Sequence, residues 1–217
     1  MVTANLIYAI IIVPISILIP ITVTIINRKF FDESLKIIFY YLLVDGIINI
    51  FAAVLAAFGI HNLPVLHVFT VLELLLLSYF YLLVLKNKTI RTAIKYLMIL
   101  FPILCIINFS FFQSINHFNT NTRPIEALIL MGCSLAYFAQ TNDANIKWSL
   151  NPLNWINTGI LLYFSGALFI FSFSNISEGE LSKKYQAIYT LMWNIHATLV
   201  LAMYLLFAVG FSKCRKQ

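Results

Sequence analysis

Long uncharged stretches alternate with short polar segments along the whole chain. Each stretch is close to the roughly 20 apolar residues that a helix needs to cross about 30 Å of hydrocarbon, and the connections between them are rich in Asn, Thr and Ser, as is typical of loops. The pattern predicts an all-α fold in one domain over residues 1–217. This is a polytopic membrane bundle of seven transmembrane helices, with spans at about Ala4–Ile26, Ile37–Ile60, Leu63–Leu85, Tyr96–Phe112, Pro124–Ala139, Leu153–Phe173 and Tyr185–Phe211.

Two of these spans need separate comment. The first contains Pro14 and Pro20, and each proline frees a backbone carbonyl and is expected to kink the helix. No basic residue precedes this span and no small-residue cleavage site follows it, so it does not have the pattern of a signal peptide. The fifth span is the shortest, and its inclusion rests on the charges of the loops on either side of it.

The composition supports a bilayer as the main solvent of the chain. Hydrophobic residues make up 61% of the 217 positions and charged residues only 10%, whereas soluble domains have about 25% charged residues. Seven spans leave no room for a soluble catalytic or sensor module. The net charge of +6 comes from residues in loops, so it indicates membrane orientation and gives no reason to expect binding to nucleic acid.

The basic residues are divided unequally between the two sides of the predicted bundle. Cytoplasmic loops of membrane proteins carry an excess of Lys and Arg. One side holds Arg123, Lys183 and Lys184, so we predict that this side and the N-terminus lie outside and that the C-terminus is cytoplasmic. The other side holds the remaining 11 of the 14 basic residues: Arg28, Lys29, Lys36, Lys86, Lys88, Arg91, Lys95, Lys147, Lys213, Arg215 and Lys216.

Two ionisable residues are predicted near the middle of the membrane. Glu73 lies about ten residues into the third span, and His196 about eleven residues into the seventh. A charge there costs about 2.5–3.5 kcal/mol on insertion scales, so Glu73 needs a partner from another helix or a proton. A Glu73–His196 contact is one candidate and would form a ligand or proton-relay site. The alternative is that each residue makes a structural hydrogen bond between helices.

Other polar residues in the spans extend this candidate site. Thr70 lies one helical turn from both His67 and Glu73. His67 is nearer the outer boundary of the membrane, so the alternative for it is a solvated histidine at the interface. Asp45 lies in a polar turn of the second span, where an inter-helix hydrogen bond would also explain it. Glu126 begins the fifth span, where the helix dipole stabilises a carboxylate at the rim.

The sixth and seventh spans contribute the last candidates. Asn194 is two residues from His196, and Tyr163 is followed by Ser165 and Gly166, a small and polar patch of the kind found where helices pack closely. The complete predicted ligand-binding or proton-relay set is Glu73, His196, His67, Thr70, Asp45, Asn194 and Tyr163. The three cysteines, of which Cys105 and Cys133 lie in spans and Cys214 in the tail, are predicted to be free thiols.

Several functions are disfavoured by what the sequence lacks. No predicted span contains Lys or Arg, which excludes a retinal Schiff base and an arginine-based voltage sensor. No HExxH, GxSxG or glycine-rich phosphate loop is present. We therefore predict no catalytic residues, no metal ligands and no cofactor. A surface metal site formed by His61, His67 and His117 has no supporting ligand spacing.

Three segments are similar to a group of known sequences. They are 62–73 (NLPVLHVFTVLE), 154–166 (NWINTGILLYFSG) and Trp193–His196 continuing to residues 206–211 (LFAVGF). In combination the chain resembles uncharacterised small seven-helix inner-membrane proteins of Bacteroidota-type bacteria. The resemblance implies a multi-pass location in a bacterial cytoplasmic membrane and no particular activity or site residue.

The leading functional hypothesis from the sequence is a small-molecule sensor or receptor-like protein that signals to a cytoplasmic partner. Its polar span residues are biased towards the outer half, and its cytoplasmic side is basic. A proton-coupled or small-solute transporter and a structural membrane subunit are the alternatives, and a metal-dependent intramembrane hydrolase ranks last. The predicted partners are the lipid bilayer, an unidentified small molecule and a cytoplasmic signalling protein. A homo-oligomer is compatible with the sequence.

Overall fold

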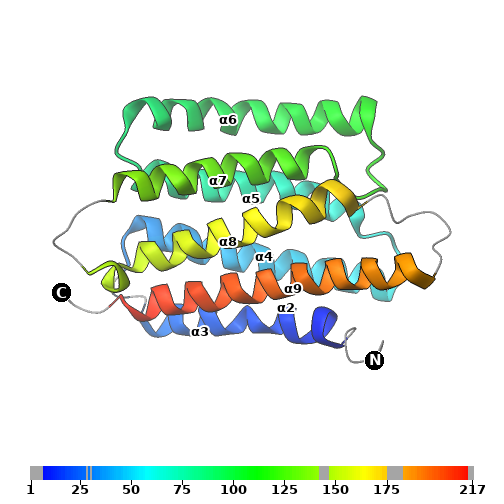
Figure 1. Cartoon of the computed structure of the whole chain (residues 1–217), viewed down its shortest axis with the longest axis horizontal. Helices are drawn as coiled ribbons and strands as arrows, with labels where there is room; N and C mark the ends of the chain where they lie inside the picture. Colours follow the sequence, from blue (N-terminus) through cyan, green and yellow to red (C-terminus); the bar gives the residue numbers. More distant parts are fainter. Residues whose placement is uncertain (1–6, 28, 30, 142–146, 175–182, 215–217) are drawn as a thin grey trace.

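Long antiparallel helices form the whole of the described structure, a computed structural model of the chain (Figure 1). It describes residues 7–27, 29, 31–141, 147–174 and 183–214, with the backbone alone for 183–186. The described part of the chain begins at one end of the bundle and ends at the other. One end carries eight described Lys and Arg side chains, and we call it the basic end. All eight are exposed: Lys29, Lys36, Lys86, Lys88, Arg91, Lys95, Lys147 and Lys213. The other end, with the loops at 58–62 and 113–121, is called the far end.

The first membrane-length helix is interrupted. It consists of a π-helical turn, η1 (Tyr8–Ile12), followed by α2 (Val13–Ser16) and α3 (Leu18–Asn27). Proline has no N–H to donate and its ring crowds the preceding turn, which explains the irregular backbone beside Pro14. Next to Pro20, the hydroxyl of Thr24 donates to the carbonyl oxygen of Pro20 at 2.6 Å. The expected distortion of this helix is therefore observed.

The next two helices are α4 (Glu33–Ala57) and α5 (Leu63–Val84). Asp32 caps α4, with its Oδ1 accepting from the backbone N–H of Leu35 at 2.9 Å, and this places the helix start four residues before the predicted span. The connection turns at Gly59, whose φ of 71° suits glycine. Pro64 then occupies the first turn of α5, where the missing N–H costs no hydrogen bond.

Helix α6 (Lys88–Ile107) continues into a second π-helical turn, η3 (Asn108–Phe112). It begins eight residues before the predicted span because the side chain of Asn87 accepts from the backbone N–H groups of Thr89 and Ile90, at 2.9 and 3.2 Å. The helix lies at the edge of the bundle, with α5 as its main packing partner (Figure 1). The rest of its surface is available to lipid.

The last three long helices are α7 (Thr122–Gln140), α8 (Pro152–Phe173), which follows a short 3₁₀ turn, η4 (Trp148–Leu150), and α9 (Lys183–Ser212). Helix α8 packs against both α7 and α9. At Gly210 the two backbones approach so closely that an added Cβ would lie 2.9 Å from the carbonyl oxygen of Pro152. A glycine is therefore required for the observed α8–α9 distance at the basic end.

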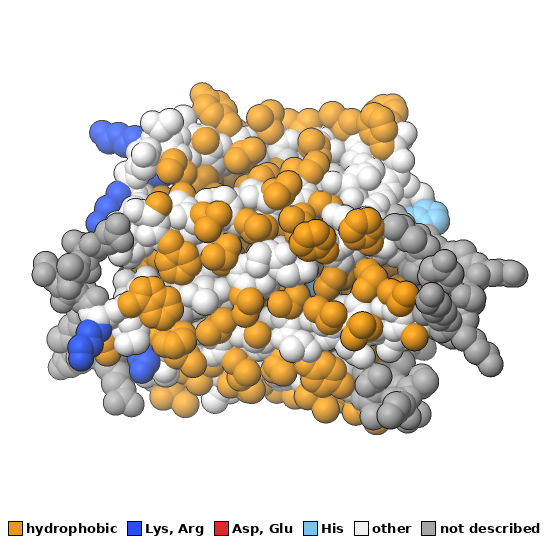
Figure 2. Space-filling model, viewed as in Figure 1, with side chains coloured by type: hydrophobic (Ala, Val, Ile, Leu, Met, Phe, Trp, Pro, Cys, Tyr) orange, Lys and Arg blue, Asp and Glu red, His pale blue; other side chains and the backbone are white. Residues whose placement is uncertain are grey.

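Six of these helical segments are long and apolar enough to cross a membrane: Tyr8–Asn27, Glu33–Ala57, Leu63–Val84, Lys88–Phe112, Pro152–Phe173 and Ala187–Ser212. Helix α7 is not among them, and it contains Arg123 and Glu126 in its first two turns. Large hydrophobic side chains are spread over the sides of the molecule, and Lys and Arg gather at one end of the visible face (Figure 2). This distribution fits a helical membrane protein. The seventh crossing and the orientation stay predictions.

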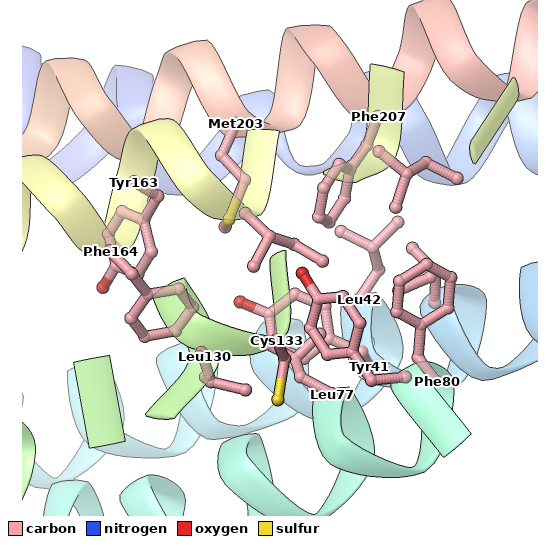
Figure 3. Close-up of a cluster of buried hydrophobic side chains, with 14 of the residues drawn as sticks. Tyr41, Leu42, Leu77, Phe80, Leu130, Cys133, Tyr163, Phe164, Met203 and Phe207 are labelled. Atoms are coloured by element: carbon pink, nitrogen blue, oxygen red, sulfur yellow. The ribbon is translucent and has the colours of Figure 1, made fainter. Parts of the chain in front are cut away.

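A tightly packed core fills the middle of the bundle and its basic half. It includes Leu42, Phe80, Phe164 and Phe207, all 0% exposed (Figure 3). Tyr41, Tyr163 and Met203 belong to the same core, although they also border the hollow region described next. All three cysteines are free and buried, as predicted for free thiols.

Candidate functional site

A cavity of about 670 Å³ lies in the half of the bundle nearer the far end. Its walls come from η1 and α2, the second half of α4, the first half of α5, the 118–119 loop, the start of α7, the second half of α8 and the first two thirds of α9. Six of the seven predicted site residues border it: Asp45, Thr70, Glu73, Tyr163, Asn194 and His196. The structure therefore brings together residues from four helices that the sequence indicated separately.

Glu73 is paired with Arg123. Its carboxylate is 1% exposed and contacts the Arg123 guanidinium through Oε2, while its Oε1 accepts from the hydroxyl of Tyr41 at 2.9 Å. The same guanidinium nitrogen, Nη1, lies 2.7 Å from Oε2 of Glu126. We call Glu73, Arg123 and Glu126 the Arg123 cluster. Sharing one cation between two carboxylates compensates for the cost of burying them only in part.

Three sequence-based expectations are corrected by this cluster. The partner of Glu73 is Arg123, and no Glu73–His196 contact is found among the described residues. Arg123 lies in the first turn of α7, so the statement that no span contains Lys or Arg does not hold if α7 crosses the membrane. Glu126 is 0% exposed and is not the rim carboxylate that was expected, because Arg123, three residues earlier on the same helix, turns inward with it.

The loop before α7 explains why Arg123 points inward. Asn119 accepts from both the backbone N–H and the hydroxyl of Thr122, at 3.1 and 2.6 Å. This fixes the first turn of α7 against the bundle, with the Arg123 side chain only 15% exposed. The guanidinium also lies over two rings, 4.6 Å from the centroid of Phe171 and 5.8 Å from that of Phe69. Such cation–π contacts are strongest where water is excluded.

Asp45 forms a second polar group on the cavity wall. Its side chain is 5% exposed and accepts from the hydroxyl of Tyr204 on α9 and from Nδ2 of Asn49 at 2.7 Å. The inter-helix hydrogen bond expected for Asp45 is therefore present. No described basic side chain forms an ion pair with Asp45, because Arg123 is bound to the two glutamates.

His196 lies among aromatic rings on the α8–α9 side of the cavity. Its Nε2 is 3.2 Å from the hydroxyl of Tyr163, and its ring packs edge-on against Phe171 and Trp193 with centroid distances of 5.6 and 5.5 Å. This is the structural hydrogen bond that was the alternative to a ligand-binding or proton-relay role. The same arrangement leaves His196 bordering the cavity.

His67 does not line the cavity. It is 6% exposed and its Nε2 lies 2.9 Å from the carbonyl oxygen of His117, so the solvated interfacial histidine is not observed. Thr70 donates to the carbonyl oxygen of Leu66 at 3.0 Å. Among the described residues no group of three or more His, Cys, Asp or Glu could hold a metal ion.

Sequence reasoning missed the residues that complete the site. Tyr41 and Tyr204 supply hydroxyl groups to Glu73 and Asp45, yet a tyrosine in an apolar span has no distinctive spacing. Arg123 carried a usable signal, since Glu126 follows it at the three-residue spacing of helical ion pairs. That signal was outweighed by the position of Arg123 at the end of a loop.

Comparisons of this chain with protein-family models, with curated proteins and with solved structures each found no match.

Proposed function

We propose that this chain is a receptor-like membrane protein that binds a small molecule in its far-end cavity. The observation that carries the proposal is the cavity itself. Its volume of about 670 Å³ falls within the range of roughly 300–1,000 Å³ typical of small-molecule pockets, which are mainly apolar with a few convergent polar groups. Here the polar groups include Asp45, Glu73, Arg123 and His196, set among aromatic side chains.

The closed basic half favours a receptor over an open channel. Tyr41, Tyr163 and Met203 border both the cavity and the core, so we take them as the floor of the cavity; Figure 3 shows them within the core cluster. Beneath this floor Leu42, Leu77 and Phe207 are 0% exposed. A ligand in the cavity would contact α4, α5, α8 and α9 at one end, and these helices continue to the exposed basic end. Ligand binding can shift such helices only through contacts that differ between two arrangements.

Binding is tested with a variant that fills the cavity. Ala197 borders it and is 6% exposed, so Ala197→Phe should remove space for a ligand. Ala53→Phe, on the exposed surface of α4, is the matched control. We expect a compound panel, read by thermal shift and native mass spectrometry in nanodiscs, to give ligands that stabilise the wild type and Ala53→Phe and leave Ala197→Phe unaffected. Ligands that stabilise all three proteins equally, or no ligand at all, would overturn the proposal.

A proton-coupled transporter is the second candidate, favoured by one observation. The carboxyl groups of Asp45 and Glu73 border the same cavity and lie within electrostatic range of each other, and carboxylates inside membranes are typical of proton relays. Proteoliposomes loaded with a ligand found in the panel separate the two functions. Net flux of that ligand driven by a proton gradient would show that the protein is a transporter and would overturn the receptor proposal. Binding without flux supports the receptor.

A further inference from the structure

We infer that the cavity selects a cationic small molecule, a protonated amine or a quaternary ammonium ion with an apolar body. The inference rests on the proposed function and names the chemical class of its ligand. Three features of the cavity carry it: an acidic group without a cation, an excess of carboxylates over cations, and walls made of aromatic rings.

The acidic group is Asp45. Its two hydrogen bonds come from neutral donors, Tyr204 and Asn49, and these donors orient the carboxylate without neutralising it. A buried carboxylate without a counter-charge is costly in a low-dielectric region. Because Asp45 borders the cavity, a cation placed in the cavity would reach it directly and remove that cost.

The charges of the described residues do not balance around the cavity. Asp45, Glu73 and Glu126 are 5%, 1% and 0% exposed, and Arg123 is the described base that pairs within this group. One guanidinium therefore accompanies three buried carboxyl groups and forms ion pairs with two of them, Glu73 and Glu126. In addition, Oε1 of Glu126 is buried with no hydrogen-bond partner among the described residues. A second positive charge is what the arrangement lacks.

The aromatic walls suit a cation. Trp193, Tyr163 and Tyr189 border the cavity together with Tyr41, Phe118 and Tyr204, and the faces of such rings attract ammonium groups. The wall already binds one cation in this way, since Arg123 lies over the ring of Phe171. Apolar side chains such as Val13, Ile48 and Leu66 line the remainder, so a hydrocarbon body attached to the cationic group would also be accommodated.

The test compares two probes of equal shape, benzyltrimethylammonium and its uncharged carbon isostere, neopentylbenzene. Removing the charge should weaken binding to the wild type at least about tenfold, because the neutral probe makes no cation–π contact with the aromatic walls and is not attracted to Asp45. In Asp45→Asn, which keeps the size of the side chain, we expect the ammonium probe to lose about tenfold or more in affinity while the neutral probe is unaffected. Glu33→Gln, an exposed acid on the same helix, is the control and should bind both probes as the wild type does.

A second variant keeps the test decisive if Asp45→Asn fails to fold. Trp193→Leu removes a ring from the wall without changing any charge, and it should weaken the ammonium probe more than the neutral one. Equal affinity of the two probes for the wild type would overturn the cationic class and leave the proposed binding function intact. The same holds if a folded Asp45→Asn binds the ammonium probe as well as the wild type does. Failure of both probes, together with failure of the whole panel, would overturn both proposals.

Discussion

The guanidinium of Arg123 lies against the carboxylate of Glu73, which is 50 positions earlier in the chain. The pair joins α7 to α5 inside the bundle, and Tyr41 on α4 donates to the same carboxylate. The ion pair and the Tyr41 hydrogen bond together connect three helices at the edge of the cavity. Its removal affects the burial of two acids as well as the packing of those helices.

Arg123→Met should be strongly destabilising. The change leaves Glu73 and Glu126 buried without a cation, and breaking a buried pair on one side costs about 3–5 kcal/mol. Unfolding in mixed micelles measures the free energy change. Arg91→Met, at an exposed position of α6, should stay within about 0.5 kcal/mol of the wild type.

The double variant Glu73→Gln with Arg123→Met identifies the cause. If unpaired charge is responsible, neutralising Glu73 should recover part of the lost stability. An Arg123→Met protein as stable as Arg91→Met would show that the pair is not formed in the membrane.

Gly210→Ala should loosen the contact between α8 and α9. The new Cβ would meet the carbonyl oxygen of Pro152 at 2.9 Å and Cγ1 of Ile156 at 3.0 Å, and overpacking of this kind costs about 1–3 kcal/mol. Gly132→Ala is the matched control, since a Cβ there has nothing within 4 Å and the helix gains about 0.5–1 kcal/mol from losing a glycine. Thermal unfolding of both variants should therefore shift in opposite directions. Equal shifts would contradict the observed close approach.

Tyr81→Phe tests a polar contact in the packed half. The Tyr81 hydroxyl donates to Oδ1 of Asn157 at 2.8 Å, and Nδ2 of Asn157 donates to the carbonyl oxygen of Ser134 at 3.1 Å. Losing the hydroxyl leaves a buried amide oxygen unsatisfied, with an expected cost of about 1–3 kcal/mol. Tyr79→Phe, 43% exposed on the same helix, should be close to neutral. Ligand binding should be unchanged in both, because neither residue borders the cavity.

Cysteine labelling tests whether α7 crosses the membrane. Asn116→Cys and Lys147→Cys place exposed thiols before and after α7. In intact cells an impermeant maleimide should label the first variant, and it should label the second only after permeabilisation. Labelling of both from the same side would show that α7 does not cross.

The native cysteines should give little background in this assay. Cys105 and Cys133 are buried within helices. Burial raises the pKa of the Cys214 thiol, just beyond the end of α9, to about 12. Because the thiolate is the reactive form, Cys214 should remain unlabelled near neutral pH and react only as the pH approaches that value. Rapid labelling of the wild type at pH 7 would contradict the burial of Cys214.

The helices could be predicted from the sequence because lipid imposes a single requirement, about 20 apolar residues per crossing. Helix ends were less predictable, since polar caps such as Asp32 and Asn87 extend α4 and α6 beyond their apolar cores. The candidate residues were found for a related reason: Asp45, Glu73 and His196 are exceptions to the apolar pattern, and such exceptions are few.

Their partners could not be found in this way. The contact of Glu73 depends on which face of α5 meets α7, and hydrophobicity on all sides of α5 leaves that rotation undetermined. The depth of His196 matched that of Glu73, but depth says nothing about direction around the bundle. His196 instead contacts Tyr163 on the adjacent helix.

The contrast between a hollow far half and a solid basic half has a mechanical consequence. Phe80, Phe164 and Phe207 are buried in the solid half. Because close-packed interiors resist compression and transmit strain, this core would act as a pivot for the helices if the proposed ligand widened the hollow half. Widening the hollow half by a small amount would then displace the opposite helix ends, and the loops that join them, in the reverse direction. Ligand binding in the cavity would therefore change the spacing of the lysines on the basic surface without a tunnel through the protein.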